Sequence, residues 1–193
     1  MTFKVFTDLH LFSPIYTRLS IDDAMLLRKP DESTILLGDI VDLANMKEDE
    51  YTEASAFHTT LELTYGDRYI NGNHERVTTN NETYVVTLSN GKRVVFAHGD
   101  IEANPTKWIK YRQKPHGAGW FKRKFIIPFI AEAEEIIERK PKEEFLERAY
   151  KLMKTHSCDY YVCGHFHPEE RLTIQYKTKT VIILPRGLNY LNL

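Results

Sequence analysis

Five short motifs in this chain combine aspartate, asparagine and histidine in ways that suit divalent metal ions. Each motif comes just after an apolar run, so each is expected at the end of a strand. The motifs are Asp8-Leu9-His10, Gly38-Asp39-Ile40-Val41-Asp42, Gly72-Asn73-His74-Glu75, Ala97-His98-Gly99-Asp100 and Gly164-His165-Phe166-His167. Two divalent ions need about eight to twelve oxygen and imidazole ligands, shared between protein and water. Together the motifs supply a suitable set for a two-metal centre.

The second motif contains Asp39, the residue around which we interpret the other motifs. The apolar run over residues 34–37 stops at Gly38, which is typical of a buried strand, and it delivers Asp39 at the strand's carboxyl end. Open α/β sheets bind ligands at that end, and we interpret Asp39 as a carboxylate that bridges both ions. Any one motif alone is weak, because a lone histidine near an apolar strand is usually a core or surface residue. Ligation by oxygen and nitrogen without cysteine argues against a structural zinc site.

The elements that must position the first three motifs follow a strand–helix–strand order. The pattern predicts strands over residues 3–7, 34–37 and 68–70, and helices over 20–28 and 48–63. This succession predicts a parallel sheet with right-handed crossovers. Each of these strands ends in a candidate ligand.

The second half of the chain mixes predicted hairpins with predicted helices. The hairpins cover residues 83–97 and 172–184, and Asn90-Gly91 is a strong turn signal for the first of them. A strand over 159–163 precedes the last motif, and residues 187–193 can add an edge strand. From Ile101 to about Thr155 the pattern is helical, and both ends of this segment adjoin candidate ligands. We therefore predict one domain over residues 1–193, with a helical insert at about 101–155 beside the metal site.

Composition sets limits on the class of protein. A chain of 193 residues is long enough to bury a full core, and a net charge of −1 gives no global field that would demand nucleic acid. Only two cysteines are present, which indicates no disulfide framework. No run reaches the roughly 18 apolar residues of a membrane span, and we see no signal peptide. These features predict a cytoplasmic protein.

Taken in order, the five motifs resemble the signature of the calcineurin-like metallophosphoesterase superfamily. That signature is Asp-x-His, Gly-Asp-x-x-Asp, Gly-Asn-His-Asp/Glu, a histidine before glycine, and Gly-His-x-His. The resemblance implies an α/β (α+β) fold, a four-layer αββα sandwich of two mixed β-sheets with a helical cap insert. It also implies the ligand sets. One ion would be held by Asp8, His10, Asp39 and His167, and the other by Asp39, Asn73, His98 and His165.

The activity implied by the resemblance is hydrolysis of phosphoric esters, with a hydroxide between the ions attacking phosphorus. The family makes His74 the general acid and Asp42 the partner that orients its ring. For Asp42 a carboxylate at a helix start is the alternative, and for Glu75 both a supporting and a surface role stay open. Manganese is the expected ion, with iron, zinc, nickel or cobalt as alternatives, because imidazole and carboxylate ligands accept all of them.

The predicted insert carries the residues that would select a substrate. Its first part is basic and aromatic, which fits a small phosphorylated, nucleotide-containing substrate and also fits nucleic acid, while a solvated helix face is the alternative. The candidate substrate-binding residues are Lys107, Lys110, Arg112, Lys122 and Arg123. An apolar stripe over residues 120–130 suits a core, a dimer interface or an acyl-chain groove.

Two further readings of the family stay open. The position of the insert resembles the UDP-diacylglucosamine pyrophosphohydrolases, although the main branch of that group has arginine in place of His74. A catalytically silent binding scaffold on the same fold, as in a retromer subunit, is the alternative from another functional class.

Overall fold

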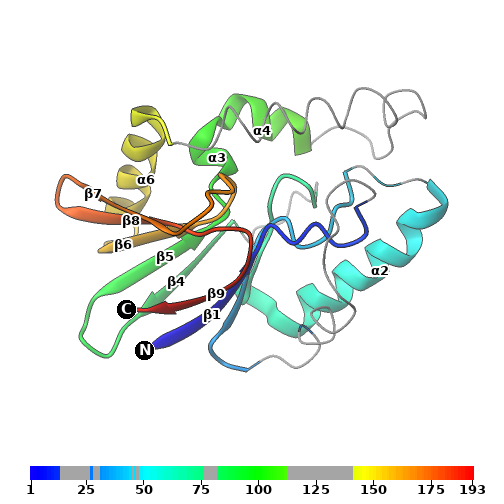
Figure 1. Ribbon diagram of the computed structural model, residues 1–193, viewed down its shortest axis with the longest axis horizontal. Helices are drawn as coiled ribbons and strands as arrows, with labels where there is room; N and C mark the ends of the chain where they lie inside the picture. Colours follow the sequence, from blue (N-terminus) through cyan, green and yellow to red (C-terminus); the bar gives the residue numbers. More distant parts are fainter. Residues whose placement is uncertain (14–26, 28–30, 45, 47, 76–81, 113–140) are drawn as a thin grey trace.

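A computed structural model describes residues 1–13, 27, 31–44, 46, 48–75, 82–112 and 141–193 of the chain (Figure 1). The predicted helix over residues 20–28 lies outside these residues except for Leu27. Along the described chain, no helix is long and apolar enough to cross a membrane.

The first sheet contains the strands that precede the first three motifs. Its strand order is β3-β2-β1-β9, and β1, β2 and β3 run parallel, as the strand–helix–strand order predicts. Strand β9 joins antiparallel to β1 as the edge strand, with Thr7 opposite Gly187. The strands are β1 (Thr2–Thr7), β2 (Thr34–Leu37), β3 (Tyr69–Ile70) and β9 (Gly187–Asn192).

The second sheet contains both predicted hairpins. Its order is β4-β5-β6-β8-β7, with antiparallel hairpin pairs at the two edges and parallel pairs in the middle. The strands are β4 (Thr83–Thr87), β5 (Arg93–Ala97), β6 (Tyr160–Cys163), β7 (Leu172–Tyr176) and β8 (Lys179–Ile183). Both sheets are therefore mixed.

Three clusters of buried side chains define the layers. Phe3 and Val5 of β1 face a core shared with Phe96 of β5, so this core lies between the two sheets. Phe6 faces the other way, because successive residues of a strand point to opposite faces, and it joins a second core with the helix α2 (Glu48–Tyr65). A third core packs the helix α6 (Glu143–Thr155) onto the outer face of the second sheet. The four-layer αββα sandwich implied by the resemblance is thus confirmed.

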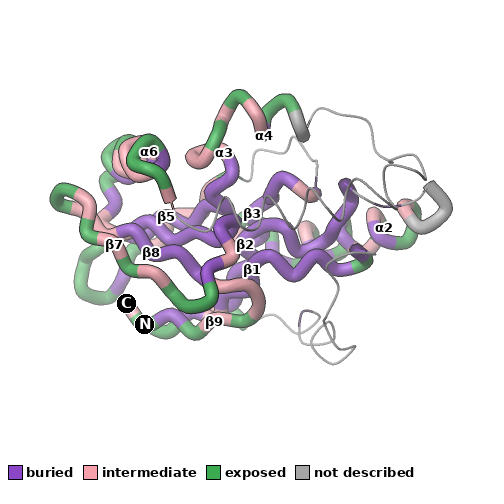
Figure 2. The backbone as a smooth tube through the Cα atoms, turned by 45° about the horizontal axis from the view of Figure 1, so that its top comes forward, coloured by how far each residue is buried: buried purple, intermediate pink, exposed green. Residues whose placement is uncertain are grey.

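The tube view makes the same division visible. In Figure 2 the central strands β1, β2 and β5 are buried along most of their length, whereas β7 and β9 carry exposed and intermediate residues at the sheet edges. A short 3-10 helix, η1 (Gly66–Arg68), connects α2 to β3, which is why β3 starts one residue later than the apolar pattern suggests.

The structure describes two parts of the segment predicted as a helical insert. Its first part forms the short helices α3 (Asp100–Ala103) and α4 (Pro105–Arg112), which follow β5 directly. Its last part, α6, buries Phe145, Ala149 and Met153 against the second sheet and is an outer layer of the sandwich rather than a cap. Residues 113–140, which include the apolar stripe, lie outside the described residues.

The packing of α2 generates a stability prediction with a matched control on the same helix. Leu61 is 2% exposed, whereas Leu63 is 83% exposed. We expect Leu61→Ala to lower the free energy of unfolding by about 2–5 kcal/mol, because it leaves a cavity in the core beneath α2. Leu63→Ala should change the free energy by less than about 0.5 kcal/mol. Urea unfolding followed by circular dichroism measures both, and equal effects of the two variants would contradict the packing described.

Candidate metal centre

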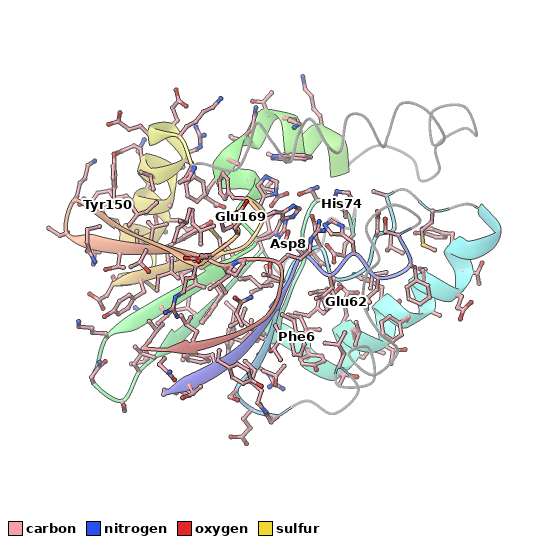
Figure 3. All side chains as sticks on the ribbon, in the orientation of Figure 1. Phe6, Asp8, Glu62, His74, Tyr150 and Glu169 are labelled. Carbon is pink, nitrogen blue, oxygen red and sulfur yellow. The ribbon has the colours of Figure 1, made fainter. Side chains whose placement is uncertain are left out.

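The predicted ligands gather at one end of the sandwich. Asp8 follows β1, Asp39 follows β2, and His98 and the Gly164–His167 loop follow the parallel strands β5 and β6. Parallel strands present their carboxyl ends on the same edge, so loops from both sheets meet there. Figure 3 shows Asp8 and His74 close to each other at these strand ends, on the side where α4 lies.

One group of ligand atoms joins Asp8, His10 and His167, whose candidate ligand atoms all lie within 4.8 Å of one another. His167 Nε2 lies 2.9 Å from Asp8 Oδ1, and the rings of His10 and His167 are 5.8 Å apart between centroids. With the Asp39 carboxylate these are the residues that the resemblance implies for the first ion.

A second group joins Asp8, Asp39 and His98 by the same distance criterion, and a third joins His10, Asp39 and His74. His98 Nε2 lies 3.3 Å from Asp39 Oδ2 and 4.0 Å from Asp8 Oδ1. Asp8, His10 and Asp39 each take part in two of the three groups, so the groups overlap in one cluster, and the bridging role of Asp39 stays a prediction.

Asn73 and His165 complete the predicted set. Asn73 is 2% exposed, and among the described residues its Oδ1 atom has no hydrogen-bond partner. The ring of His165 lies 5.1 Å from the ring of His98, although His165 is not a member of the three groups above. A buried amide oxygen without a partner is costly unless a cation takes that place, so the donor set fits a pair of divalent ions.

Electrostatics of the site keep the carboxylates charged. Burial raises the pKa of Asp8 and of Asp39, but nearby histidines, His167 and His98 foremost, outweigh burial and hold both pKa values low. Burial lowers the pKa of His98, yet Asp39 and Asp8 raise it to about 10. Burial, together with the charge of His74, lowers the pKa of His10 to about 3, so His10 is neutral and able to ligate. The two buried carboxylates thus favour positive charge at the place where a cation would bind.

The backbone is strained at the same residues. Five of the predicted ligands have positive φ angles, a conformation that costs roughly 1–3 kcal/mol for residues other than glycine and that clusters at functional sites. They are Asp8 (55°), His10 (49°), Asp39 (51°), His165 (69°) and His167 (45°). The fold therefore bears local strain to aim these side chains at one point.

Two glycines of the motifs, Gly72 and Gly164, are required because side chains of the site lie too close to them for a Cβ atom. A Cβ atom on Gly72 would lie 2.2 Å from Asp39 Oδ1, and one on Gly164 would lie 2.0 Å from Thr7 Oγ1 and 2.3 Å from Asp8 Oδ2. Neither site has room for a side chain. The Thr7 hydroxyl donates to Asp8 Oδ2 at 2.5 Å, a supporting contact that the sequence analysis missed.

Glu75 is fully buried, and its carboxylate accepts four backbone N–H groups. The donors are Asp39 N (2.9 Å) and Gly72 N (2.7 Å) on Oε2, and Ile40 N (2.5 Å) and Val41 N (3.1 Å) on Oε1. Glu75 thereby joins the loop after β2 to the loop after β3. Of the two roles left open for Glu75, the structure supports the internal one and not the surface one.

His74 and Asp42 form a direct pair. His74 Nδ1 lies 2.9 Å from Asp42 Oδ1, and the backbone N–H of His74 donates to Asp39 Oδ1 at 2.7 Å. Asp42 is fully buried; burial raises its pKa, but His74 holds it down to about 2. The next helix begins only at Glu48, so Asp42 does not act as a helix-start carboxylate.

The predicted substrate contacts are described only in part. Lys107 Nζ lies 4.0 Å from the ring centroid of Trp108, which is 4% exposed and meets the ring of His165 edge to face at 5.2 Å. Lys110 is exposed on α4. Arg112 ends α4, and its side chain lies outside the description, as do Lys122 and Arg123. Trp108 thus packs directly beside a predicted ligand.

Comparison with known proteins gives a family match. A family model described as calcineurin-like phosphoesterase matches residues 1–169. No curated protein shows significant similarity to the chain.

Solved structures that resemble the chain come from several organisms. A predicted phosphoesterase from Streptococcus pneumoniae TIGR4 is 14% identical, with 96% of this chain and 72% of that chain covered and a TM-score of 0.47. Vps29 from Entamoeba histolytica in complex with Zn²⁺ is 16% identical (96% and 74% covered, TM-score 0.44). A dimetal phosphatase from Danio rerio is 12% identical (98% and 91% covered, TM-score 0.49).

The shared position of Asp39 generates a prediction for metal binding. We expect Asp39→Asn to weaken Mn²⁺ binding by more than about a hundredfold, since even residues that only support a ligand typically contribute 10–100-fold. Isothermal titration calorimetry with MnCl₂ measures the affinity, and circular dichroism checks the fold, which should persist because the change is isosteric.

The matched control is Asp67→Asn, at an exposed position of η1. It should bind Mn²⁺ as the unaltered protein does. Wild-type affinity for all ions in Asp39→Asn would show that Asp39 is not a ligand.

Glu75 generates a stability prediction. Glu75→Gln replaces one acceptor oxygen by an amide that donates, which leaves two buried N–H groups unsatisfied. We expect a loss of about 2–6 kcal/mol in the free energy of unfolding, at roughly 1–3 kcal/mol for each orphaned group. Urea unfolding measures it beside Glu53→Gln, an exposed position on α2 that should change little. Equal stability of the two variants would remove Glu75 from its proposed structural role.

Proposed function

Because the chain belongs to the calcineurin-like phosphoesterase family, we propose that it is a metal-dependent hydrolase of phosphoric esters. One observation carries the proposal: the ligand atoms of two buried carboxylates, Asp8 and Asp39, lie within 4.8 Å of imidazole nitrogens in three groups of residues. We include phosphomonoesters, phosphodiesters and nucleotide diphosphates among the substrates.

The residues that would hold two divalent ions are those of the two predicted ligand sets, with Asp39 in both. Such a pair supplies Lewis acidity, which neutralises phosphoryl oxygens and lowers the pKa of water. Manganese is the ion we would test first, because the mixed carboxylate, amide and imidazole set suits it, and iron, zinc, nickel and cobalt follow. The protein itself would hold the ligand atoms in position before any ion or substrate binds, through the strained backbone at the ligands and through the hydrogen bonds of Glu75.

His74 is the residue we assign as general acid. Its Nδ1 faces the Asp42 carboxylate at 2.9 Å, which orients the ring and leaves Nε2 to carry a proton to the leaving oxygen. The His74 side chain is 15% exposed, whereas that of Asp42 is fully buried, so the acid can reach a substrate while its partner stays dry. The His10 ring packs edge to face against the His74 ring at 4.5 Å, which places the acid beside the predicted ligands.

Helix α4 would form one wall of the substrate site. Trp108 is buried against His165, so its ring serves as a wall and is not open for stacking on a base. Among the side chains of this helix that the structure describes, Lys107 and Lys110 are the cations that could approach an anionic substrate. A nucleotide-containing substrate or nucleic acid would meet these lysines first.

The function and the acid are tested together by leaving-group dependence. With Mn²⁺ present, we expect hydrolysis of p-nitrophenyl phosphate, bis-p-nitrophenyl phosphate or a UDP-sugar. We expect His74→Asn to lower kcat about 10²–10⁴-fold for phenyl phosphate, whose leaving group needs a proton. The loss should be smaller for p-nitrophenyl phosphate, whose leaving group is a better anion. Steady-state kinetics measure both esters.

The control is His156→Asn, at the C-terminus of α6 and at the opposite end of β6 from the Gly164–His167 loop, which should keep its activity. Equal losses for both esters in His74→Asn would exclude a role in protonation. If metal-loaded protein cleaves none of these esters, the result supports the alternative that the protein is a catalytically silent binding scaffold.

A further inference from the structure

Asn71 lies between β3 and the metal centre, at the start of the loop that carries Asn73 and His74. β3 ends at Ile70, and Asn71 is 1% exposed. The strand gives this loop little support, because β3 is an edge strand that pairs with β2 through two residues only. Backbone held by so few ladder contacts opens easily, so other contacts must hold Asn73 and His74 in place.

Two side chains of α2 contact the amide group of Asn71 at both of its polar atoms. His58 Nε2 lies 3.1 Å from Asn71 Oδ1, and Asn71 Nδ2 donates to Glu62 Oε1 at 3.1 Å. Figure 3 labels Glu62 on α2 and His74 at the strand ends. His58 and Glu62 are one helical turn apart, and His58 Nδ1 lies 3.6 Å from Glu62 Oε2, which closes a ring of three side chains. We call His58, Glu62 and Asn71 the α2 clamp.

The donors and acceptors of the α2 clamp fit one arrangement. The Asn71 amide nitrogen donates to Glu62, so the amide oxygen accepts, and His58 must carry a proton on Nε2. Burial lowers the pKa of His58 and outweighs Glu62 and Asn71, which raise it, so the ring is neutral at pH 7 with its one proton on Nε2. His58 is 3% exposed, and loss of its N–H would remove a hydrogen bond of a buried amide oxygen.

A second path of contacts runs from the α2 clamp toward the predicted ligands through Tyr69. The His58 ring meets the Tyr69 ring edge to face at 5.2 Å, and the Tyr69 hydroxyl donates to Glu75 Oε1 at 3.3 Å. Glu75 in turn accepts the backbone N–H groups of Asp39 and its neighbours. The loop after β3 is therefore held at its start by the α2 clamp and at its end by Glu75.

We propose that His58 is a positioning residue that, through Asn71, holds His74 in place for proton transfer to the leaving group. The inference rests on the proposed function and adds a residue of α2 to it. His58 belongs to none of the groups of candidate ligand atoms found among the described residues, so its effect is indirect.

The contacts of His74 show why a shift of the loop would matter. Its backbone N–H donates to Asp39 Oδ1 at 2.7 Å, and its ring lies 2.9 Å from Asp42 Oδ1. His74 comes three residues after Asn71, so movement of Asn71 would disturb both contacts. Small misplacements of a reacting group lower rates strongly, which gives the α2 clamp leverage on catalysis.

The first test follows amide hydrogen exchange in metal-free protein. We expect His58→Leu to raise the exchange rate of the His74 N–H by roughly tenfold, because the loss of one buried hydrogen bond shifts a local opening equilibrium by about that factor. Amides of β5 and β6, in the second sheet, should change less. NMR measures the rates residue by residue and needs neither metal nor substrate.

The second test measures leaving-group dependence in Mn²⁺-loaded protein. We expect His58→Leu to lower kcat for phenyl phosphate about ten- to a hundredfold, with a smaller loss for p-nitrophenyl phosphate, whose leaving group is a better anion. In the double variant His58→Leu/His74→Asn the loss should not exceed that of His74→Asn alone, because His58 acts through His74. His58→Gln, whose amide can donate to Asn71, should keep most of the activity.

Two further variants separate the α2 clamp from the general stability of α2. Glu62→Ala removes the other partner of Asn71 at a side chain that is 25% exposed, so this change is well tolerated and should repeat both effects in the same direction. Leu61→Ala is the matched control, because it weakens the core beneath the same helix without touching the α2 clamp. It should keep the wild-type ratio of the two esters and should not raise exchange at His74 beyond that of β5 and β6.

Three results would overturn the inference. The first is exchange of the His74 N–H that rises no more than that of β5 and β6 in both His58→Leu and Glu62→Ala. The second is an equal loss of activity toward the two esters in these variants, which would make the α2 clamp a general support of the fold. The third is a double variant in which the losses of His58→Leu and His74→Asn add.

Failure of this inference is separable from failure of the proposed function. If wild-type protein cleaves both esters and His58→Leu keeps the wild-type ratio between them, the function stands and the role of His58 falls. If wild-type protein cleaves neither ester, the function falls, and faster exchange confined to the loop after β3 still supports the positioning of that loop by the α2 clamp.

Discussion

Two ionised carboxylates buried side by side are the constraint on which this structure depends. Asp8 and Asp39 are 0% and 2% exposed, and taking such groups out of water costs several kcal/mol each unless positive charge compensates. The imidazoles around them provide that compensation in part, and the strongly raised pKa of His98 records the demand. A divalent ion satisfies the same demand without protons. The charges of the centre therefore favour the binding of cations, whether or not a substrate is present.

Other residues of the site hold these two carboxylates in their buried positions, where the loss of hydration costs free energy. Glu75 binds the loop after β2 through three N–H groups and the loop after β3 through a fourth, so one side chain fixes the backbone on both sides of Asp39. The Thr7 hydroxyl donates to the Asp8 carboxylate and so helps to hold that side chain. Positive φ angles at the ligands and the absence of room at Gly72 and Gly164 are consequences of the same crowding.

Local pattern was enough to predict the strands, because a strand's apolar pattern depends on neighbours in the chain, whereas the ligand roles came from the resemblance and stay a prediction. The run at β2 has the predicted bounds, and the four strands of the two hairpins lie within the predicted ranges 83–97 and 172–184. Non-local features were out of reach. The amphipathic pattern of α6 shows that it has an apolar face but not which sheet that face covers, and the place of β9 depends on the pairing of Gly187 with Thr7. No spacing within the sequence reports such a register.

The centre lies at the seam between the two sheets, and this has a consequence for stability as well as for chemistry. Asp8, Asp39 and Asn73 come from loops of the first sheet, whereas His98, His165 and His167 come from loops of the second. The sheets also meet through the apolar core between them. Ions bound at the seam would tie the sheets at one end, as the loop from β8 to β9 ties them covalently. Binding free energy gained only by the native arrangement is stability gained by that arrangement, so metal binding and sheet packing should be coupled in this protein.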